Sequence, residues 1–457
     1  MHGGALASKG ALGAGPGEMR QRGNTGGIVF RTMRGVSVAA LAGAMVALSA
    51  TSATAATSAP KPETERITLS ATGEQGNGDA YGPQFSADGR FAVFTAYASN
   101  LVPGDTNGFG DVFVRDVRKG TVERVSVSSD GAQADSESSA QAISADGRYI
   151  LFRSNARNLV RWDNPPTNVA ADDIYLHDRR TGTTERISVA LDGGSAFAAG
   201  ATMSADARYI AFNAKADRME TDPGDLFGVV YVLDRRTGVV ERITNRNRPD
   251  NPALLQGLSA DGRYVAYTQL VPRSSYGRTW VHDRRTGTEE QVNVKPDGTP
   301  AQRYAMPASL SADGRTIAFD YWGDEELVPG ETPSAASTVY VRDLRKDVTR
   351  RVNAGPAGEN RVREPRLSPD GRYLTYQADP RLADGRLGPA NVYLRDLRTG
   401  TTRLVSESVT GEPVTDVSVA VYSVSAEARR VGLGSASAEL ALDDTNGHYD
   451  GFVRRLR

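Results

Sequence analysis

The sequence contains no cysteine among its 457 residues. Disulfide bonds, a lipid-modified N-terminal cysteine and thiol catalysis are therefore all excluded. Histidine is also scarce, because the chain has only His2, His177, His282 and His448. No Gly-x-Ser-x-Gly motif is present, so the strand–turn–helix nucleophile of the α/β-hydrolases is not indicated.

An excess of charge of either sign is missing as well. The chain has 54 basic and 55 acidic side chains, which gives a net charge of −1. Proteins that bind nucleic acid usually have an excess of basic residues. Because this chain has no such excess, no nucleic-acid partner is expected. Carboxylates are plentiful, but the sequence does not show which of them lie together, and we assign no catalytic residue from it.

No apolar run is long enough to span a bilayer. The longest lies at 36–48, after Arg31 and Arg34, and is followed by Ala53-Thr54-Ala55. A basic segment, a short apolar run and an Ala-x-Ala end are typical of a secretory signal peptide, whereas a transmembrane anchor needs about 20 residues. We therefore predict a signal peptide over 1–55, a short linker over 56–62, and a secreted, extracellular or periplasmic protein without a transmembrane anchor.

The rest of the chain is dominated by one repeated turn, Ser-Ala-Asp-Gly-Arg or a close variant. The seven copies begin at Ser86, Ser144, Ser204, Ser259, Ser311, Ser368 and Ser425. Their mean spacing is about 56 residues. A constant spacing of this size is the signature of a repeat architecture such as a propeller or a solenoid. The turn glycine is replaced in two copies, by Ala207 and Ala428.

Each repeat reads as four β-strands, which we call a, b, c and d. In the second repeat, strand b is expected over 149–152, strand c over 173–178 and strand d over 184–188, and strand a precedes the turn. Strands b and c have an aromatic residue at the same place in nearly every repeat, which indicates packing inside each sheet. No segment shows a convincing helical period, so the sequence predicts an all-β fold.

Four-stranded antiparallel units in series are typical of blades around a central channel. We therefore predict a seven-bladed β-propeller over 63–457. The seventh repeat ends after strand c, and the missing strand d is present at the other end as Glu65-Arg66-Ile67-Thr68. We predict that this N-terminal strand closes the ring and removes the open sheet edge.

The a–b and c–d turns are short and alike, whereas the b–c and d–a loops are long and dissimilar. Binding residues generally lie on variable loops that a rigid scaffold holds, so the loop face and the channel mouth are the expected binding site. We select Trp162, Trp322 and Tyr276 as candidate ligand-binding residues. The alternative is that each aromatic side chain packs only against its own loop.

Two b–c loops have the same spacing of oxygen ligands. The sets are Asp105, Asn107 and Asp111 in the first repeat, and Asp444, Asn446 and Asp450 in the seventh. Oxygen ligands at alternate positions of a glycine-containing turn suit Ca²⁺, so calcium is the one cofactor that we predict. The alternative is an Asn-Gly turn in which the aspartates have a structural role.

The repeat resembles a known family at Ser368–Leu374 and Asn391–Asp396, which read Ser-Pro-Asp-Gly-Arg-Tyr-Leu and Asn-Val-Tyr-Leu-Arg-Asp. These segments look like the TolB-like, WD40-like β-propeller repeat. The resemblance implies a periplasmic or extracellular propeller that is usually a platform for protein interaction. Some relatives assist serine peptidases and some are polysaccharide lyases. No binding residue of the family matches a motif in this chain.

The sequence thus favours a secreted, non-enzymatic, monomeric propeller that binds a protein or a cell-envelope component. The alternative is a secreted propeller enzyme that acts on carbohydrate as a lyase or a glycosidase. Carboxylates that converge with aromatic side chains at the channel mouth would favour the enzyme.

Overall fold

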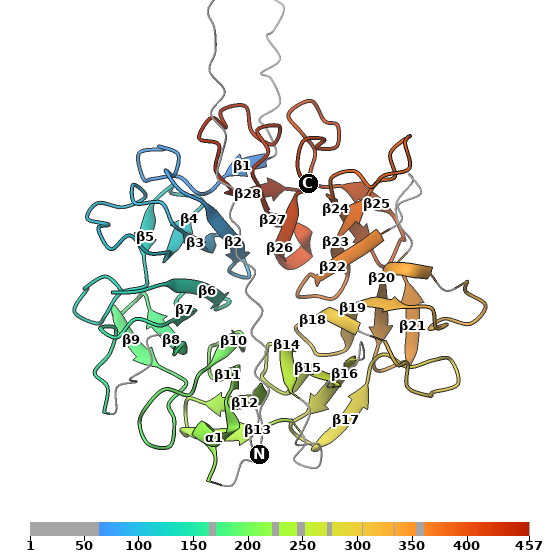
Figure 1. Ribbon diagram of the computed structural model, residues 1–457, viewed down its shortest axis with the longest axis horizontal. Coiled ribbons are helices and arrows are strands. Elements are labelled where there is room, and N and C mark those ends of the chain that lie inside the picture. The colour runs from blue at the N-terminus through green and yellow to red at the C-terminus, as the bar shows by residue number, and fades with distance from the viewer. Residues whose placement is uncertain are drawn as a thin grey trace, which may run out of the picture. The chain divides into compact units, whose positions relative to one another are not determined.

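Seven four-stranded antiparallel sheets surround a central axis in the computed structural model (Figure 1). The model describes residues 64–163, 171–221, 228–244, 252–271, 277–303, 305–332, 334–352 and 361–456, all within the unit Ala59–Arg457. The all-β, seven-bladed propeller that the repeat predicts is confirmed. The predicted signal peptide over 1–55 and linker over 56–62 lie outside the described residues.

The strands of each blade follow one another along the chain. Blade one contains β2 (Ala80–Phe85), β3 (Phe91–Ala96), β4 (Asp111–Asp116) and β5 (Val122–Arg124). Blade two contains β6 (Ser138–Ile143), β7 (Tyr149–Ser154), β8 (Asp173–Asp178) and β9 (Thr183–Arg186). Blade three contains β10 (Ala199–Met203), β11 (Tyr209–Ala214), β12 (Val229–Asp234) and β13 (Val239–Arg242).

Blades four to six repeat this order. Blade four contains β14 (Ala253–Leu258), β15 (Tyr264–Leu270), β16 (Gly277–Asp283) and β17 (Thr288–Gln291). Blade five contains β18 (Ala305–Leu310), β19 (Thr316–Gly323), β20 (Ser334–Asp343) and β21 (Val348–Arg351). Blade six contains β22 (Arg361–Leu367), β23 (Tyr373–Asp379), β24 (Asn391–Asp396) and β25 (Thr402–Leu404).

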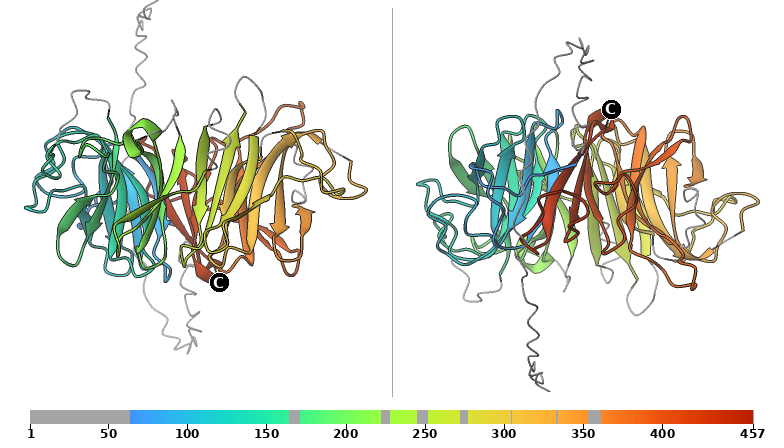
Figure 2. Two further views of the ribbon diagram at one scale, coloured as in Figure 1. Left: turned by 90° about the horizontal axis from the view of Figure 1, so that it is seen from below. Right: turned by 90° about the horizontal axis from the view of Figure 1, so that it is seen from above.

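The seventh sheet joins strands from both ends of the described chain. It contains β26 (Ala420–Val424), β27 (Arg430–Ser435), β28 (Asp450–Arg455) and, as its outer strand, β1 (Thr64–Arg66). The strands β1 and β28 are antiparallel, with Thr64 opposite Arg454 and Arg66 opposite Phe452. The side views show the sheets standing next to one another, with turns and loops at two opposite faces (Figure 2).

Helix is nearly absent from the described residues. It consists of α1 (Ala216–Met219) and a 3₁₀-helix, η1 (Ala426–Ala428). Neither is long or apolar enough to cross a membrane. The core therefore lies within and between the sheets, and the aromatic residues of strands b and c form part of it. For example, the rings of Phe152 and Tyr175 stack with their centroids 5.6 Å apart.

The repeated turn is held by its own polar side chains. In blade two the hydroxyl of Ser144 donates to Oδ1 of Asp146 (2.6 Å) and accepts the amide of Tyr149 (2.9 Å). The guanidinium of Arg148 binds the carboxylate of Asp178 at the end of strand c, with Nε–Oδ1 at 2.8 Å. This contact is the main cause that lowers the pKa of Asp178 to about 2. The Ser, Asp and Arg of the repeat are thus explained by contacts within one blade.

The replaced turn glycines keep the backbone conformation of their sister turns. Ala207, Ala428 and Asp347 have φ of +56°, +50° and +56°. Such values are uncommon outside glycine, so the surrounding ring holds these residues in the left-handed region.

The same turns also join neighbouring blades. The alanine amide of one copy donates to the backbone oxygen of the equivalent residue in the next copy, as from Ala145 to Ala205 at 2.9 Å. Among the described residues, bonds of this kind run from Ala87 to Ala145, Ala145 to Ala205, Ala205 to Ala260, Ala260 to Ala312, and Ala312 to Pro369. Proline has no N–H to donate, so Pro369 does not continue the series.

Aromatic rings of one blade lie against the turn glycine of the next. A Cβ placed on Gly147 would lie 2.3 Å from Cδ2 of Phe91, and one on Gly262 would lie 2.2 Å from Cδ2 of Tyr209. Glycine is needed here for two reasons, because the turn requires a positive φ and the ring leaves no space for a side chain.

We expect Gly147→Val to destabilise the protein more than Gly182→Val, as measured by urea unfolding. Both residues have a φ of +73°, so both substitutions carry the cost of a left-handed conformation, about 1–2 kcal/mol. Only Gly147 faces the Phe91 ring, whereas nothing lies within 4 Å of a Cβ on Gly182. Equal losses for the two variants would contradict the importance of this contact between blades.

Candidate functional site at the inner rim

The innermost strands of the ring are the a strands β2, β6, β10, β14, β18, β22 and β26 (Figure 1). We call their residues, together with the loop residues that contact them at the loop face, the inner rim. Each a strand is out of register with its b strand at one place. A β-bulge turns a side chain out of the regular alternation, which is a common way to aim residues at a site.

The bulge positions differ between blades although the flanking repeats are alike. The residues there are Gly82, Gln141, Gly200, Gln256, Met306, Glu364 and Tyr422. This variation within one chain indicates that the fold does not require a particular side chain at these positions. The inner rim is therefore where a binding surface can differ from blade to blade.

Side chains of neighbouring blades anchor the bulges. Oε1 of Gln141 accepts the amide of Ala201 in blade three (3.0 Å), and Oε1 of Gln256 accepts the amide of Ala308 in blade five (2.9 Å). In blade four the amide of Leu255 is taken by Asn213 of blade three. Without these side chains, the backbone amides would have no hydrogen-bond partner in the sheet. The hydrogen bonds therefore hold the inner rim in a fixed conformation.

Four tyrosines, which we call the tyrosine cluster, gather at the rim between blades seven and one: Tyr81, Tyr97, Tyr422 and Tyr449. The rings of Tyr81 and Tyr449 stack with centroids 4.9 Å apart, and Tyr97 meets Tyr81 edge-on at 6.4 Å. The hydroxyl oxygens of Tyr422 and Tyr449 are 3.3 Å apart. Tyr97 is 52% exposed, so the cluster presents an aromatic surface to solvent.

Asp79 ties this cluster to the loop of blade seven. Its carboxylate accepts the backbone amide of Tyr449 (2.8 Å) and the hydroxyl of Tyr81 (3.1 Å). Nδ1 of His448 lies 3.4 Å from the same carboxylate. The pKa of Asp79 is lowered, chiefly because the Tyr449 amide donates to it. The carboxylate therefore acts as a fixed negative anchor for the tyrosine rings.

A second part of the rim lies between blades five and six. The guanidinium carbon of Arg361 lies 5.0 Å from the ring centroid of Trp322, which is 47% exposed. Nη1 of Arg363 binds Oδ1 of Asp379 at 2.6 Å. An exposed indole beside two arginines can contact both the apolar face of a ligand and its acidic groups.

The bulge of blade six is strained. Glu364 has a φ of +55°, although it is not a glycine. Its Oε2 lies 3.3 Å from Nη2 of Arg366. Such a conformation costs on the order of 1–3 kcal/mol and tends to occur at functional sites. The strain at Glu364 thus singles out the same part of the rim as Trp322 and Arg361.

Asp320 lies beneath Trp322 and is only 3% exposed. Burial raises its pKa to about 7, against the opposite effect of hydrogen bonds from Ser337 and Trp322. Ser337 donates to this carboxyl group and contacts the carbonyl of Val362 in blade six. Asp320 thus joins two blades, in the same strand position as Asn213 in blade three.

The three aromatic residues selected from the sequence have different surroundings. Trp322 lies at the inner rim, as described above. Trp162 is half-buried, packs against the core of blades one and two, and has the Arg186 guanidinium carbon 3.8 Å from its ring centroid. Tyr276 lies outside the described residues. The surroundings of Trp162 favour loop packing, and its role in binding stays a prediction.

Sequence reasoning did not select Tyr97, Tyr422, Tyr449 or Arg361. The first and third lie at the ends of loops, where a single aromatic residue is ordinary. Tyr422 and Arg361 lie in strands a, whose bulges the sequence does not reveal. An alignment of the a strands of the seven repeats would have shown that both residues differ from the residues at the equivalent positions of the other repeats.

The loop that contains Asp105, Asn107 and Asp111 is held by an arginine of strand d. A single nitrogen, Nη1 of Arg124, lies 3.2 Å from Oδ1 of Asp105 and 3.3 Å from Oδ2 of Asp111. The amide nitrogen of Asn107 donates to Asp111 at 2.9 Å. A positive group therefore already lies between the two carboxylates.

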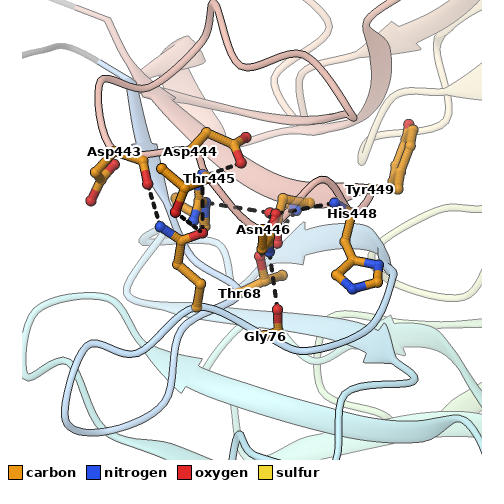
Figure 3. Close-up of polar contacts among 12 residues, drawn as sticks. Thr68, Gly76, Asp443, Asp444, Thr445, Asn446, His448 and Tyr449 are labelled. Carbon is orange, nitrogen blue, oxygen red and sulfur yellow. Dashed lines mark hydrogen bonds and ion pairs between the residues drawn. The ribbon is translucent and has the colours of Figure 1, made fainter. Parts of the chain in front are cut away.

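The loop of blade seven repeats this arrangement. Nη2 of Arg66 lies 2.9 Å from Oδ1 of Asp444, and its Nε lies 3.4 Å from Oδ2 of Asp450. Figure 3 shows Asn446 donating to the carbonyl of Gly76 (3.0 Å), while its Oδ1 accepts the amide of His448 (3.1 Å). The asparagine oxygen is thus engaged in the turn, and the guanidinium lies where a cation would lie.

Calcium is therefore not confirmed at either loop, and the contacts favour the structural alternative. Among the described residues, no group of three or more His, Asp or Glu side chains is arranged to hold a metal ion. Burial is the main cause that raises the pKa of Asp105, Asp444 and Asp450, and the nearby arginine acts in the opposite direction. A buried carboxylate with an arginine partner is a common structural device.

Comparison with known proteins supports the fold. No family model and no curated protein matches the chain. The solved structures that resemble it include an oligogalacturonate lyase from Vibrio parahaemolyticus, with 12% identity, a TM-score of 0.50, and coverage of 86% of this chain and 93% of that one. Another is the β-propeller domain of the trilobed protease from Pyrococcus furiosus, with 12% identity, 78% and 90% coverage and a TM-score of 0.47.

TolB from Acinetobacter baumannii is also among the similar structures. Its identity is 17%, its TM-score is 0.37, and the match covers 64% of this chain and 58% of TolB. TolB is thus one of the propeller proteins to which this chain is similar. At these identities the similarity shows the shared fold, which is common to binding proteins and enzymes.

We expect Arg66→Ala to lower the free energy of unfolding by about 3–5 kcal/mol, because it leaves buried carboxylates without their positive partner. The Arg66 side chain is 2% exposed and that of Asp444 is 4% exposed. Urea unfolding measures the loss, and Arg398→Ala, at an exposed turn residue, is the control.

Thermal unfolding of the unchanged protein, with and without Ca²⁺, tests whether the two loops bind calcium. We expect millimolar Ca²⁺ to leave the unfolding temperature of the unchanged protein where it is, since Arg66 and Arg124 already bind the carboxylates. A rise with Ca²⁺ that Asp105→Ala and Asp444→Ala together remove would support the metal site instead.

Proposed function

We propose that this chain is a secreted, non-catalytic β-propeller that binds a protein or a cell-envelope component at its inner rim. The observation that supports this most is the set of aromatic side chains at the inner rim, namely the tyrosine cluster, in which Tyr97 is 52% exposed, and Trp322, which is 47% exposed. The segment over 1–55, with its short apolar run and Ala-x-Ala end, supports export.

The composition of the rim suits binding. Tyrosine, tryptophan and arginine are the residues that most often dominate the energy of protein interfaces. Here they are already ordered by contacts within the protein, such as the bond between Asp79 and Tyr81. Because less side-chain freedom is lost on binding, a preordered surface gains affinity.

The charges of the rim indicate the chemistry of the ligand. Arg361, Arg363 and Arg366 lie in one a strand, against the carboxylates of Glu364 and Asp379. This leaves one positive charge in excess among these five residues. A ligand with an apolar face and acidic groups, such as an acidic peptide segment or an acidic polymer of the envelope, would complement the rim.

The alternative function, an enzyme acting on carbohydrate, would use Asp320. Its pKa of about 7 would suit a general acid, and Trp322 lies beside it. However, the carboxyl group is almost fully buried and is bonded to Ser337, so a substrate could reach it only if Trp322 moved aside. The binding function requires no such movement and is therefore preferred.

We expect the double variant Tyr97→Ala, Trp322→Ala to lose its ligand but to stay folded. Its free energy of unfolding should fall by no more than about 1–3 kcal/mol, because both side chains are about half exposed and Trp322 gives up one hydrogen bond to the buried Asp320. The measurement is capture from the native culture, with bound material quantified for the unchanged and variant proteins.

The control is Leu191→Ala, at a residue that is 63% exposed away from the rim. It should capture as much ligand as the unchanged protein does. If the double variant also captures the same amount, the binding surface is not the inner rim.

A further inference from the structure

Three gaps between blades are filled by an arginine at the turn face. In the first of them, the guanidinium carbon of Arg179 in blade two lies 4.3 Å from the ring centroid of Phe91 in blade one, and its Nε binds Glu123 of blade one. The next two gaps repeat the set with Arg235, Tyr149 and Glu185, and with Arg284, Tyr209 and Glu241. Each gap thus holds one guanidinium between an aromatic ring and a carboxylate.

The gap between blades four and five keeps two of the three members. Tyr264 follows its turn as Tyr209 does, and Glu290 pairs with Val281 in the register in which Glu241 pairs with Val232. The arginine is replaced by Leu344, whose amide donates to the carbonyl of Arg315 as the amide of Arg284 donates to Arg263. The backbone is equivalent, and only the guanidinium is missing.

A cleft of about 580 Å³ lies in this gap. Its lining includes the Tyr264 ring, Val281 and Leu344, together with the carboxylates of Glu289 and Glu290. Glu290 is 43% exposed at its side chain and contacts Arg342 through Oε1. Glu289 accepts the hydroxyl of Tyr267 at 2.6 Å. A volume of this size is within the range of small-ligand sites.

Other charged groups also face the cleft. Arg315 and Arg345 lie at its edge, and Arg315 pairs with Asp313 at 3.6 Å. Asp283 is neutralised by Arg263 at 2.6 Å. With Asp283 paired to Arg263, Glu290 to Arg342 and Arg315 to Asp313, and with Glu289 and Arg345 of opposite sign, the lining has no clear excess of charge. Preference for a guanidinium group would thus come from the placement of the Tyr264 ring beside the Glu290 carboxylate.

The other unfilled gaps lack part of the set. Between blades five and six, Thr316 stands in place of the aromatic residue, and Arg350 in place of the glutamate. Between blades seven and one, Arg430 stands in place of the aromatic residue, and its Nη1 donates to the carbonyl of Asp88. Between blades six and seven the Tyr373 ring is kept, but Arg403 stands in place of the glutamate and Leu456 in place of the arginine. Of these unfilled gaps, the one between blades four and five thus keeps both ring and carboxylate, and Glu290 is contacted there by Arg342 of strand c.

We propose that this cleft binds a guanidinium group, supplied by an arginine side chain of a partner polypeptide. The group would stack on Tyr264 and bind Glu290, as Arg284 stacks on Tyr209 and binds Glu241 one gap earlier. The site lies on the turn face, opposite the loop face, so it does not depend on the function proposed for the inner rim. It would give the protein a second binding surface.

The probe is Nα-acetyl-arginine amide, and its matched control is Nα-acetyl-citrulline amide, which has the same shape without the charge. Binding to the mature protein is measured by ligand-observed NMR titration. We expect a dissociation constant in the millimolar range, the scale of a single weak contact, and binding of the citrulline compound at least tenfold weaker. Equal binding of the two compounds would overturn the proposal.

Variants locate the site. Leu344→Arg should fill the gap from within, remove the binding and raise the unfolding temperature, whereas Leu397→Arg, in the gap between blades five and six, should leave binding unchanged. Glu290→Gln should weaken binding at least tenfold. This variant provides the test if Leu344→Arg does not fold. Unchanged binding in a folded Leu344→Arg or Glu290→Gln variant would place the ligand elsewhere and contradict the proposal.

The source of the guanidinium is tested with free L-arginine. If the ligand is an arginine side chain of a polypeptide, Nα-acetyl-arginine amide should bind at least as tightly as free L-arginine. Tighter binding of free L-arginine would show a site for the amino acid and would overturn the partner polypeptide as its source.

Discussion

The closed ring requires every blade to be joined to the next, and the structure depends on these joints. At the turn face, backbone hydrogen bonds connect successive Ser-Ala-Asp turns, such as Ala145 to Ala205. At the inner rim, side chains such as Gln141 bind the amides that the bulges release. Because blades one to six are joined through their turns as well as at the inner rim, their inner strands can bear dissimilar side chains without loss of the fold.

The joints are not equal around the ring. From blade one to blade four, an arginine fills each gap between an aromatic ring and a glutamate. The arginine is replaced by Leu344 between blades four and five and by Leu397 between blades five and six. Between blades seven and one, the equivalent residue is Val117 of blade one. Clefts lie in three of these unfilled gaps. One half of the ring is thus tightly joined, and the other half contains the clefts, including the one proposed above as a guanidinium site.

The repeat made the fold predictable, because the contacts of its turn recur around the ring. The serine hydroxyl accepts the amide five residues further on in all seven copies, and the turn arginine binds the aspartate of strand c in five of them. The site was less predictable. Trp322, selected from its long loop, lies at the inner rim, and its role in binding stays a prediction, whereas Tyr422 lies on a bulge that no local pattern reveals. The aspartate loops resemble calcium loops in the spacing of their residues. This spacing does not show that Arg66 and Arg124 reach the loops from strand d. Those arginines lie in the outer strands, in Glu65-Arg66 and Glu123-Arg124, and only the register of these strands shows that they reach the loops.

The unequal joints are tested most directly by native-state hydrogen exchange across a series of low denaturant concentrations. Amides of β7 and β11, in the tightly joined half, should exchange only through global unfolding. Amides of β19 and β23 should exchange through a partial opening whose free energy is lower by at least about 1 kcal/mol, because less is buried between their blades. Equal protection in the two halves, or lower protection in β7 and β11, would contradict this account of the ring.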